Sequence, residues 1–556
     1  MRRGVRFPAA VAAVWLTFAS VAGQPGGVVI SATENGRLID VAAGGNLQHA
    51  LELARGGDVI LLQPGAVYRG PFVLPAKGNA QAIVIRTAAS EGLGDGQLPP
   101  PGNRVTPRHR GALAVLEAAH DYVVTAEPGA GRYRLVGLEI RPAPRTFTFN
   151  VVELGNGNER SLQELPHDIR IERSYVHGDP VRGSRRGVVL NGRAMAVVDS
   201  YFTDFKEDGA DTQAICGWNG PGPFEIINNR LEGAGENIMF GGADPAIPDM
   251  VPSDIRIRRN HITKPLEWRR PSRGSDWAVK NLLELKNARR VLIEGNVIEH
   301  NWSDAQNGFA VLFTVRNQDG GAPWAVIEDV TFTNNIVRAV TSGINLLGRD
   351  DNHPSGMAQR IRIANNLFAG IGDPPFGEGD GDGRFLQMLE ESSDVIVEQN
   401  TILQTGHITL LEGRGHRRFV FRNNIVRHNE FGIFGSGHAP GLDTIGRYLP
   451  GALIVGNLFI GGDGSRYPAN NHFVRSVEDV GFVNPAAGNF SLQPASAARR
   501  RGTDGRDIGA DLAIIEAATR RVIDGTQDGT DERRPVPCDD LSRGPLRAQP
   551  GCPERP

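Results

Sequence analysis

The chain has 556 residues and a nearly balanced charge, with 60 Lys and Arg against 63 Asp and Glu, for a formal net charge of −3. A nucleic-acid partner requires a concentrated basic face, so this composition argues against one. The length exceeds that of a usual single domain, but repeat proteins escape that limit because each unit contacts only its neighbours.

The N-terminus has the three parts of a secretory signal peptide. Arg2, Arg3 and Arg6 precede an apolar run that begins at Phe7 and ends in small residues near Gly23. This pattern predicts a signal peptide over residues 1–23 and a secreted or periplasmic mature protein. Its removal moves the net charge from −3 to about −6. The alternative is an uncleaved membrane anchor, but the run is shorter than the ~20 apolar residues of a spanning helix.

The next segment, residues 24–55, ends in a short amphipathic pattern. Asn46–Arg55 predicts a helix with Asn46 as its N-cap, and the first strand is expected to start at Gly56. A polar-faced helix of this kind would cover the open end of an apolar stack of coils.

A short phrase recurs along the rest of the chain. Two or three alternating apolar residues are followed by Asn or Ser and then by one or two apolar residues, which predicts strands joined by a sharp bend. The repeats are 24 to 39 residues apart, within the ~20–50-residue range of solenoids. We call the Asn or Ser of each phrase its pivot. The pivots are Ser174, Ser200, Asn229, Asn260, Asn296, Asn335, Asn366, Asn400, Asn424 and Asn457.

One Asn per repeat predicts a parallel β-helix. Asn tolerates the left-handed αL conformation needed at the bend, and stacked amides can bond each other along the axis. A leucine-rich repeat would need an L-x-x-L-x-L pattern and a near-constant unit length, and neither is present. We therefore predict an all-β, single-stranded right-handed parallel β-helix over residues 56–511, with an N-terminal capping helix.

The remaining residues, 512–556, are expected to form a partly disordered tail, because the chain beyond Ile523 is rich in Arg, Asp and Pro. Cys538 and Cys552 lie there and could pair in an oxidising compartment. The third cysteine, Cys216, lies within the repeats and is expected to be a small buried hydrophobe.

Both ends of the repeat region resemble known proteins. The sequence NLQHALELARGGDVILLQPGAVYRGPFVLPAKG is similar to the N-terminal cap and first coil of pectate-lyase-like right-handed β-helix proteins. The sequence FVNPAAGNFSLQPASAARRRGTDGRDIGAD resembles the closing segment of many bacterial secreted β-helix proteins. Together with the coils, the resemblance covers about residues 38–512. It implies the fold and only suggests an activity on polysaccharides.

Tryptophans gather in the two longest repeats, 260–296 and 296–335. Loops of this length stand beside a flat strand face and form the walls of a groove. These tryptophans either fill the space beneath the loops or offer flat stacking surfaces to sugar rings, and their number favours the second reading. The predicted substrate-binding residues are Trp268, Trp277, Trp302 and Trp324.

The same coils carry a line of charged residues. Glu284 and Lys286 alternate with leucines and should point outward on one face. Successive coils lie about 4.8 Å apart, so charged residues of the following coils are expected to extend this line along one cleft. The further residues are Arg316, Arg349, Asp350, Asp351, His353, Glu390 and Glu391.

A lyase acting on a uronic-acid polysaccharide would use this line. Arg316 and Arg349 suit the binding of the substrate carboxylate, and Lys286 could remove the sugar proton. Glu284 with nearby acids is a candidate Ca²⁺ site, and no other cofactor is predicted. The E-x-K phrase weakly resembles the charged strand of chondroitinase-B-like and alginate-lyase-like β-helix enzymes, whose fuller pattern of paired acids and a distant Lys is missing. The predicted catalytic residues are Lys286, Glu284, Arg316, Arg349 and Asp351.

Two alternatives stay open. A glycoside hydrolase needs two carboxyl groups, which Asp350, Asp351, Glu390 and Glu391 can supply, but the polygalacturonase-like signatures NTD, GHG and RIK are absent. A non-catalytic carbohydrate-binding or adhesion protein would only bind in the groove.

The loop from Gly372 to Gly383 could bind Ca²⁺ through Asp380 and Asp382, although a flexible polar loop fits its composition better. We expect a monomer with a polysaccharide partner and no membrane span after signal cleavage.

Overall fold

The computed structural model describes residues 27–33, 36–78, 80–269, 277–377 and 382–526. The predicted signal peptide (1–23) and the possible Cys538–Cys552 pair lie outside the described residues. No helix in the described part of the chain has the length and apolar character needed to cross a membrane.

Three long sheets, here named A, B and C, make up the molecule. Sheet A has the strands β1 (Val28–Thr33), β2 (Gly36–Val41), β3 (Val59–Leu62), β6 (Ile83–Thr87), β9 (Gly131–Val136), β12 (His167–Glu172), β15 (Arg193–Val198), β18 (Phe224–Ile227), β21 (Ser253–Arg258), β24 (Ala288–Glu294), β27 (Ile327–Thr333), β30 (Ala358–Ala364), β33 (Ser393–Glu398), β36 (Val420–Arg422) and β39 (Leu453–Val455).

Sheet B has the strands β4 (Val67–Arg69), β7 (Ala114–Ala118), β10 (Leu138–Pro142), β13 (Tyr175–His177), β16 (Tyr201–Phe205), β19 (Arg230–Gly233), β22 (His261–Thr263), β25 (Val297–Asn301), β28 (Ile336–Val340), β31 (Leu367–Ile371), β34 (Thr401–Gln404), β37 (Ile425–Arg427), β40 (Leu458–Ile460) and β41 (His472–Val474). Sheet C has the strands β5 (Phe72–Leu74), β8 (Tyr122–Ala126), β11 (Asn150–Leu154), β14 (Arg186–Leu190), β17 (Gln213–Gly217), β20 (Glu236–Phe240), β23 (Asn281–Leu285), β26 (Phe309–Thr314), β29 (Ser342–Leu347), β32 (Leu386–Leu389), β35 (Thr409–Glu412) and β38 (Ile433–Gly435).

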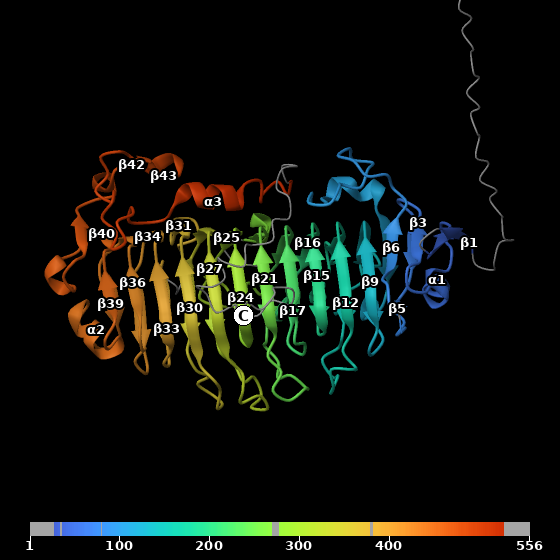
Figure 1. Ribbon diagram of the computed structural model, residues 1–556, viewed down its shortest axis with the longest axis horizontal. Coiled ribbons are helices and arrows are strands. Elements are labelled where there is room, and N and C mark those ends of the chain that lie inside the picture. Colours follow the sequence, from blue (N-terminus) through green and yellow to red (C-terminus); the bar gives the residue numbers. More distant parts are fainter. Residues whose placement is uncertain (1–26, 34–35, 79, 270–276, 378–381, 527–556) are drawn as a thin grey trace, which may run out of the picture.

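The chain winds through the sheets in the order A, B, C. Apart from the antiparallel pair β1–β2, each strand pairs in parallel with the strand one coil on, as β21 does with β24 and β24 with β27. Figure 1 shows the strands of sheet A side by side along the long axis. The predicted right-handed parallel β-helix is therefore confirmed. Alternate residues of each strand point inward, so the three sheets enclose one continuous apolar core.

The pivot residues stack at the corner between sheets A and B. The side-chain oxygen of Asn296 accepts hydrogen bonds from the backbone N–H of Asn260 (2.9 Å) and from its amide (3.1 Å). The Asn296 amide in turn donates to Ile257 O of the preceding coil and to the Asn335 side chain, at 2.9 and 3.0 Å. The expected stacking of amides along the axis is thus present.

The expectation that the pivots themselves adopt αL is wrong. The residue before each pivot has the positive φ, for example 56° at Arg259 and 57° at Asn334. The reason is that a pivot side chain must point into the coil to reach its neighbours, so the preceding residue takes the left-handed bend and points its side chain outward.

At the N-terminal end, helix α1 (Leu47–Leu53) forms where it was predicted, and the Asn46 side chain accepts a hydrogen bond from His49 N at 3.0 Å. However, β2 precedes this helix and already pairs in parallel with β3. The predicted start of the solenoid at residue 56 is therefore wrong, because one sheet A strand and the helix belong to the first coil.

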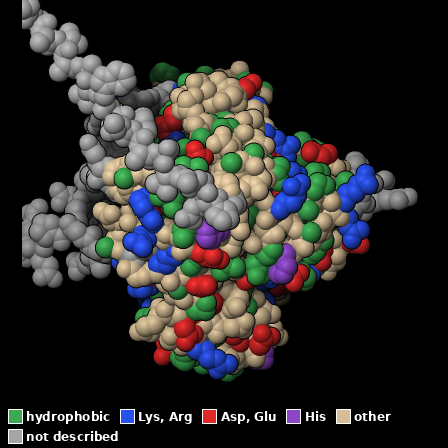
Figure 2. Space-filling model, turned by 90° about the vertical axis from the view of Figure 1, so that its right-hand side faces the viewer, with side chains coloured by type: hydrophobic (Ala, Val, Ile, Leu, Met, Phe, Trp, Pro, Cys, Tyr) green, Lys and Arg blue, Asp and Glu red, His purple; other side chains and the backbone are tan. Residues whose placement is uncertain are grey.

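On the face shown in Figure 2, basic and acidic side chains are interspersed.

At the C-terminal end, sheet B finishes at β41, so the predicted boundary at residue 511 is also wrong. The chain makes the antiparallel pair β42 (Phe482–Asn484) and β43 (Asn489–Leu492) and then runs back along the A–B corner, including helix α3 (Leu512–Thr519). Figure 1 shows α3 lying along this edge.

This return segment, residues 503–526, is hydrogen-bonded to the outward side chains of the αL positions. Asn423 Oδ1 accepts from Thr503 N at 2.9 Å, Gln399 Nε2 donates to Asp507 O at 3.1 Å, and Arg259 Nη1 donates to Ala518 O at 3.0 Å. The first part of the predicted tail is therefore an ordered part of the fold.

Candidate functional site

The outer face of sheet C carries a row of polar side chains, which we call the polar row. Asn150, Arg186, Gln213, Glu236 and Asn281 lie beside one another on successive coils. Glu153 and Glu284 lie on the same outer face, three residues further along β11 and β23. The polar row comprises Asn150, Glu153, Arg186, Gln213, Glu236, Asn281 and Glu284.

Hydrogen bonds connect the polar row from coil to coil. Arg186 Nε donates to Gln213 Oε1 at 3.1 Å, and Gln213 Nε2 donates to Glu236 Oε2 at 2.7 Å. On the next coil, Asn281 Nδ2 donates to Glu284 Oε2 at 3.1 Å. Such a network fixes the orientation of each carboxylate before any ligand arrives.

Two carboxyl groups of this row are deeply buried, Glu236 at 0% and Glu284 at 1% exposed. Burial raises the pKa of Glu236 to about 7, and the neighbouring Glu284 carboxylate acts in the same direction. Among the described residues, Glu236 Oε1 has no hydrogen-bond partner. A buried carboxyl with a raised pKa and an unused oxygen is an unusual arrangement outside functional sites.

A pocket of about 160 Å³ opens beside the row. Its wall includes Trp218, whose ring lies 5.7 Å from the Arg186 guanidinium, and its far end is formed by Gly241 and Gly242. Gly241 has a φ of 90°, and a Cβ there would lie 2.6 Å from Asn287 N and 2.9 Å from Lys286 Cβ. The glycine is therefore needed for the close approach of this turn to Lys286 and Asn287 on the next coil.

Lys286 is a partly exposed cation beside Glu284. Its side chain is 16% exposed, and its Nζ lies 3.7 Å from Glu284 Oε1. Thr314 Oγ1 donates to the same Glu284 oxygen at 3.3 Å. The predicted Glu284–Lys286 pair is thus brought together at the corner between sheets C and A.

The two predicted arginines follow on the next coils of this corner. The backbone N–H of Arg316 donates to Lys286 O at 2.9 Å, so the two residues lie on adjacent coils. The Arg316 guanidinium bonds Asp350 (3.0 Å) and Asp351, and the Arg349 guanidinium bonds Glu391 Oε2 (2.9 Å). Both arginines therefore have carboxylate partners within the protein that a substrate carboxylate would have to displace.

The predicted tryptophans lie in several places. Trp268 and Trp302 are 5% and 3% exposed and form an apolar cluster with Phe376 beneath the loops between sheets B and C. The expectation that these two stack on a sugar is wrong, because burial covers their ring faces. Trp277 packs against this cluster, and Trp324 Nε1 donates to Met250 O at 3.0 Å on the opposite edge of sheet C.

Seven residues of the site were not predicted, namely Trp218 and every member of the polar row except Glu284. The pivots mark the corner between sheets A and B, whereas the sheet C strands carry no pivot and so give no repeat signal in the sequence. The available signal was a charged residue at an outward position of a short apolar strand, as in Glu236–Phe240. Cys216 lies on the same face, fully buried with Val189 and Met239 as expected, and burial raises the pKa of its thiol to about 11.

The donor set around Glu284 does not suit Ca²⁺. Its carboxylate oxygens already accept bonds from Asn281 and Thr314, and the Lys286 ammonium lies beside them. Within the described ranges, no group of three or more His, Cys, Asp or Glu could hold a metal ion. In the other proposed loop, Asp382 pairs with Arg384 at 3.1 Å, and Asp380 lies outside the described residues.

Glu236 predicts a pH-dependent stability. Its folded pKa of about 7 exceeds the ordinary value of 4.5, so its contribution to stability is complete below about pH 4.5 and is lost as the pH rises toward 7. The wild type is expected to lose on the order of 2 kcal/mol of its free energy of unfolding between pH 5 and 8, and Glu236→Gln is expected to abolish this loss. Urea unfolding at several pH values measures this, and equal slopes for wild type and variant would contradict it.

Comparisons with known proteins found no matching family model and no matching curated protein. Among solved structures, the chain is similar to the catalytic unit of a GH87 α-1,3-glucanase from Streptomyces thermodiastaticus, with 13% identity over 83% of this chain and 71% of that one and a TM-score of 0.44. It is also similar to the PL6 alginate lyase AlyGC, with 13% identity, 85% and 57% coverage and a TM-score of 0.41. A third is pectate lyase Pel9A, with 13% identity, 83% and 89% coverage and a TM-score of 0.32. The activities in these names are those of the other proteins.

Proposed function

We propose that this chain is a secreted polysaccharide-active enzyme, of the lyase type and acting on an acidic, uronic-acid polysaccharide, with its site on the outer face of sheet C. The observation that carries the proposal is the buried pair Glu236 and Glu284 beside the accessible ammonium of Lys286. Secretion rests on the signal-peptide pattern of residues 1–23.

In the proposed lyase reaction, an elimination, Lys286 is the single group that removes and returns the proton. In its amine form, Lys286 takes the proton from C5 of the sugar, the C5–H electron pair forms the C4=C5 double bond, and the C4–O bond breaks. Lys286 then returns the proton to the leaving oxygen, so that the step balances without a further reactant. Glu284 orients the Lys286 amine, and Arg316, one coil away, exchanges Asp351 for the substrate carboxylate.

The test is the ultraviolet absorbance of the unsaturated product while the mature protein meets a panel of uronic-acid polymers, with and without Ca²⁺. We expect a rise that falls by at least about 10²-fold in Lys286→Ala, since Lys286 carries the proton. Lys77→Ala, a lysine at the N-terminal end, serves as the control. A rise unaffected by Lys286→Ala would place the chemistry elsewhere, and no cleavage of any polymer would leave carbohydrate binding alone as the function.

A glycoside hydrolase is the second candidate, with Asp350, Asp351, Glu390 and Glu391 as its carboxyl groups. A hydrolase needs one of them protonated. Burial tends to raise the pKa of Asp350, but hydrogen bonds from Asn352 N, Asn317 N and Arg316 outweigh it and lower the pKa. The bond from Arg417 lowers the pKa of Glu391. Neither group favours the proton-donor role, and new reducing ends without unsaturated product would support the hydrolase instead.

A further inference from the structure

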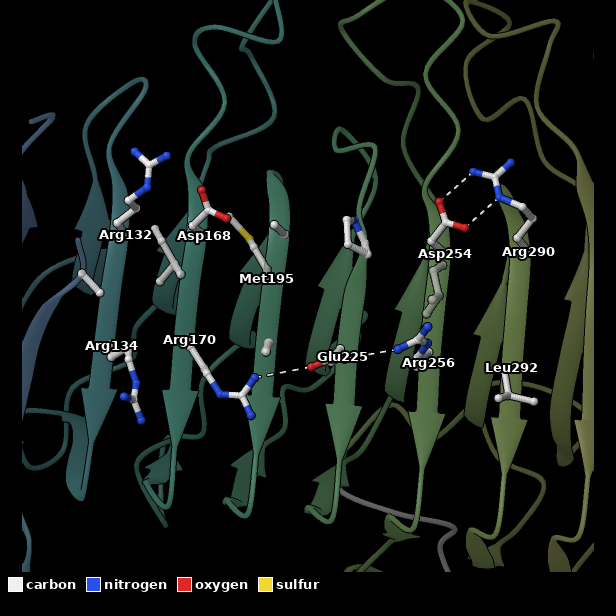
Figure 3. Close-up of a pocket in the computed structure, with 16 residues that line it drawn as sticks. Arg132, Arg134, Asp168, Arg170, Met195, Glu225, Asp254, Arg256, Arg290 and Leu292 are labelled. Atoms are coloured by element: carbon white, nitrogen blue, oxygen red, sulfur yellow. Dashed lines mark hydrogen bonds and ion pairs between the residues drawn. The ribbon is translucent and has the colours of Figure 1, made fainter. Parts of the chain in front are cut away.

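A hollow lies on the outer face of sheet A, away from the site on sheet C. This groove of about 930 Å³ crosses β9 to β24 and is lined by side chains from six neighbouring strands. Five arginines and three acids stand around it, as Figure 3 shows for the labelled residues. They are Arg132, Arg134, Arg170, Arg256 and Arg290, with Asp168, Glu225 and Asp254.

The hollow exists because one coil carries short side chains where its neighbours carry long ones. Strand pairing places Ala196 between Arg170 and Glu225 in a single outward row. Ala194 is the outward residue two positions earlier, and Pro223 lies on the next coil. These three residues form an apolar floor with taller polar walls on both sides.

The arginines around this floor keep hydrogen-bonding capacity. Glu225 is shared between Arg170 Nη1 at 3.4 Å and Arg256 Nη1 at 3.5 Å, both longer than a strong charge-assisted bond. Arg170 also bonds Glu172 through Nε at 2.9 Å, which uses one of its five donors. The two arginine side chains are 39% and 40% exposed. Figure 3 shows them pointing toward Glu225 from either side.

We propose that this groove is a second, non-catalytic site that holds a segment of a carboxylated polysaccharide. Arg170 and Arg256 stand on strands three coils apart, and both side chains reach Glu225, so two neighbouring guanidinium groups face the groove and can bind carboxylates of one sugar chain. The apolar floor of Ala194, Ala196 and Pro223 receives the CH face of a sugar ring between them. Planar guanidinium groups suit carboxylates through paired hydrogen bonds. The choice of an acidic polysaccharide as the ligand rests on the proposed function. The groove and its charged residues are observed independently of that function.

The experiment measures binding of polygalacturonate and alginate to the full chain carrying Lys286→Ala, so that cleavage does not interfere. Adding Arg170→Ala and Arg256→Ala is expected to weaken binding about tenfold and to reduce its dependence on salt. Ala196→Phe removes no charge but fills the hollow, and it is expected to weaken binding similarly. Neutral dextran, which lacks carboxylates, is expected to bind equally to the parent and to these variants.

The matched control is Arg362→Ala with Arg422→Ala. These arginines lie outside the groove on the same sheet and share Glu398, each through Nε at 2.7 Å, much as Arg170 and Arg256 share Glu225. The control removes the same charge and is expected to bind like the parent. Equal binding by all variants, or equal weakening in groove and control variants, would overturn the proposal. If the wild type cleaves no polymer but the groove variants alone lose binding, the groove stands and the lyase function fails.

Discussion

Replacing Lys264 by Met is expected to lower the free energy of unfolding by about 3–5 kcal/mol, the largest effect of any single change considered. The Lys264 ammonium is fully buried, and its Nζ donates to five oxygens. Four are backbone carbonyls, those of Gly233 (2.7 Å), Ala234 (2.9 Å), Gly235 (3.0 Å) and Asn281 (2.9 Å), and the fifth is a side-chain oxygen of Asn237 at 3.2 Å.

The cost arises because the backbone carbonyls remain when the cation is removed. Substitution can replace both side chains of an ion pair by apolar ones, but it cannot remove a backbone carbonyl. A buried acceptor left without a donor costs about 1–3 kcal/mol. Burial lowers the pKa of Lys264 to about 7, but its surroundings offer acceptors only, which suits an ammonium better than an amine.

The midpoint of urea unfolding, followed by circular dichroism, measures the change. Lys280→Met is the control: its ammonium is partly exposed and pairs with Asp211, so a cost of about 1 kcal/mol is expected. If Lys264→Met unfolds at the same urea concentration as Lys280→Met, the five-oxygen site does not stabilise the fold as argued.

Replacing Asn296 by Ala is expected to lower the free energy of unfolding by about 3 kcal/mol. The change removes the acceptor of Asn260 N and of its amide, and the donor to Ile257 O, all in the interior of the A–B corner. It also leaves a small cavity between two coils.

Serine offers a graded comparison, because the first two pivots are Ser174 and Ser200. Ser174 N donates to Ser200 Oγ at 3.1 Å, so a hydroxyl satisfies part of the same pattern. Asn296→Ser is expected to cost less than Asn296→Ala, and Asn307→Ala in an exposed loop is expected to cost under about 0.5 kcal/mol. Thermal or urea unfolding ranks the three variants, and the reverse order for Ser and Ala would contradict the hydrogen-bond argument.

The sequence by itself determined the class of fold, the pivots and most strands of sheets A and B. These features are local: an apolar alternation of period two followed by Asn or Ser places a strand and its bend whatever the rest of the chain does. The Glu284–Lys286 pair was also readable, since two residues two apart on one strand share a face.

Only the tertiary structure decided which residues of different coils meet. Glu236 and Glu284 are neighbours because the register of β20 and β23 places Glu236 beside Asn281, three residues before Glu284, and no local pattern encodes that register. The same long-range packing buried Trp268 and Trp302, paired Arg316 with Asp351, and placed Ala196 between Arg170 and Glu225. A side chain's partners in a solenoid lie one coil away, and coils of variable length hide that distance from the sequence.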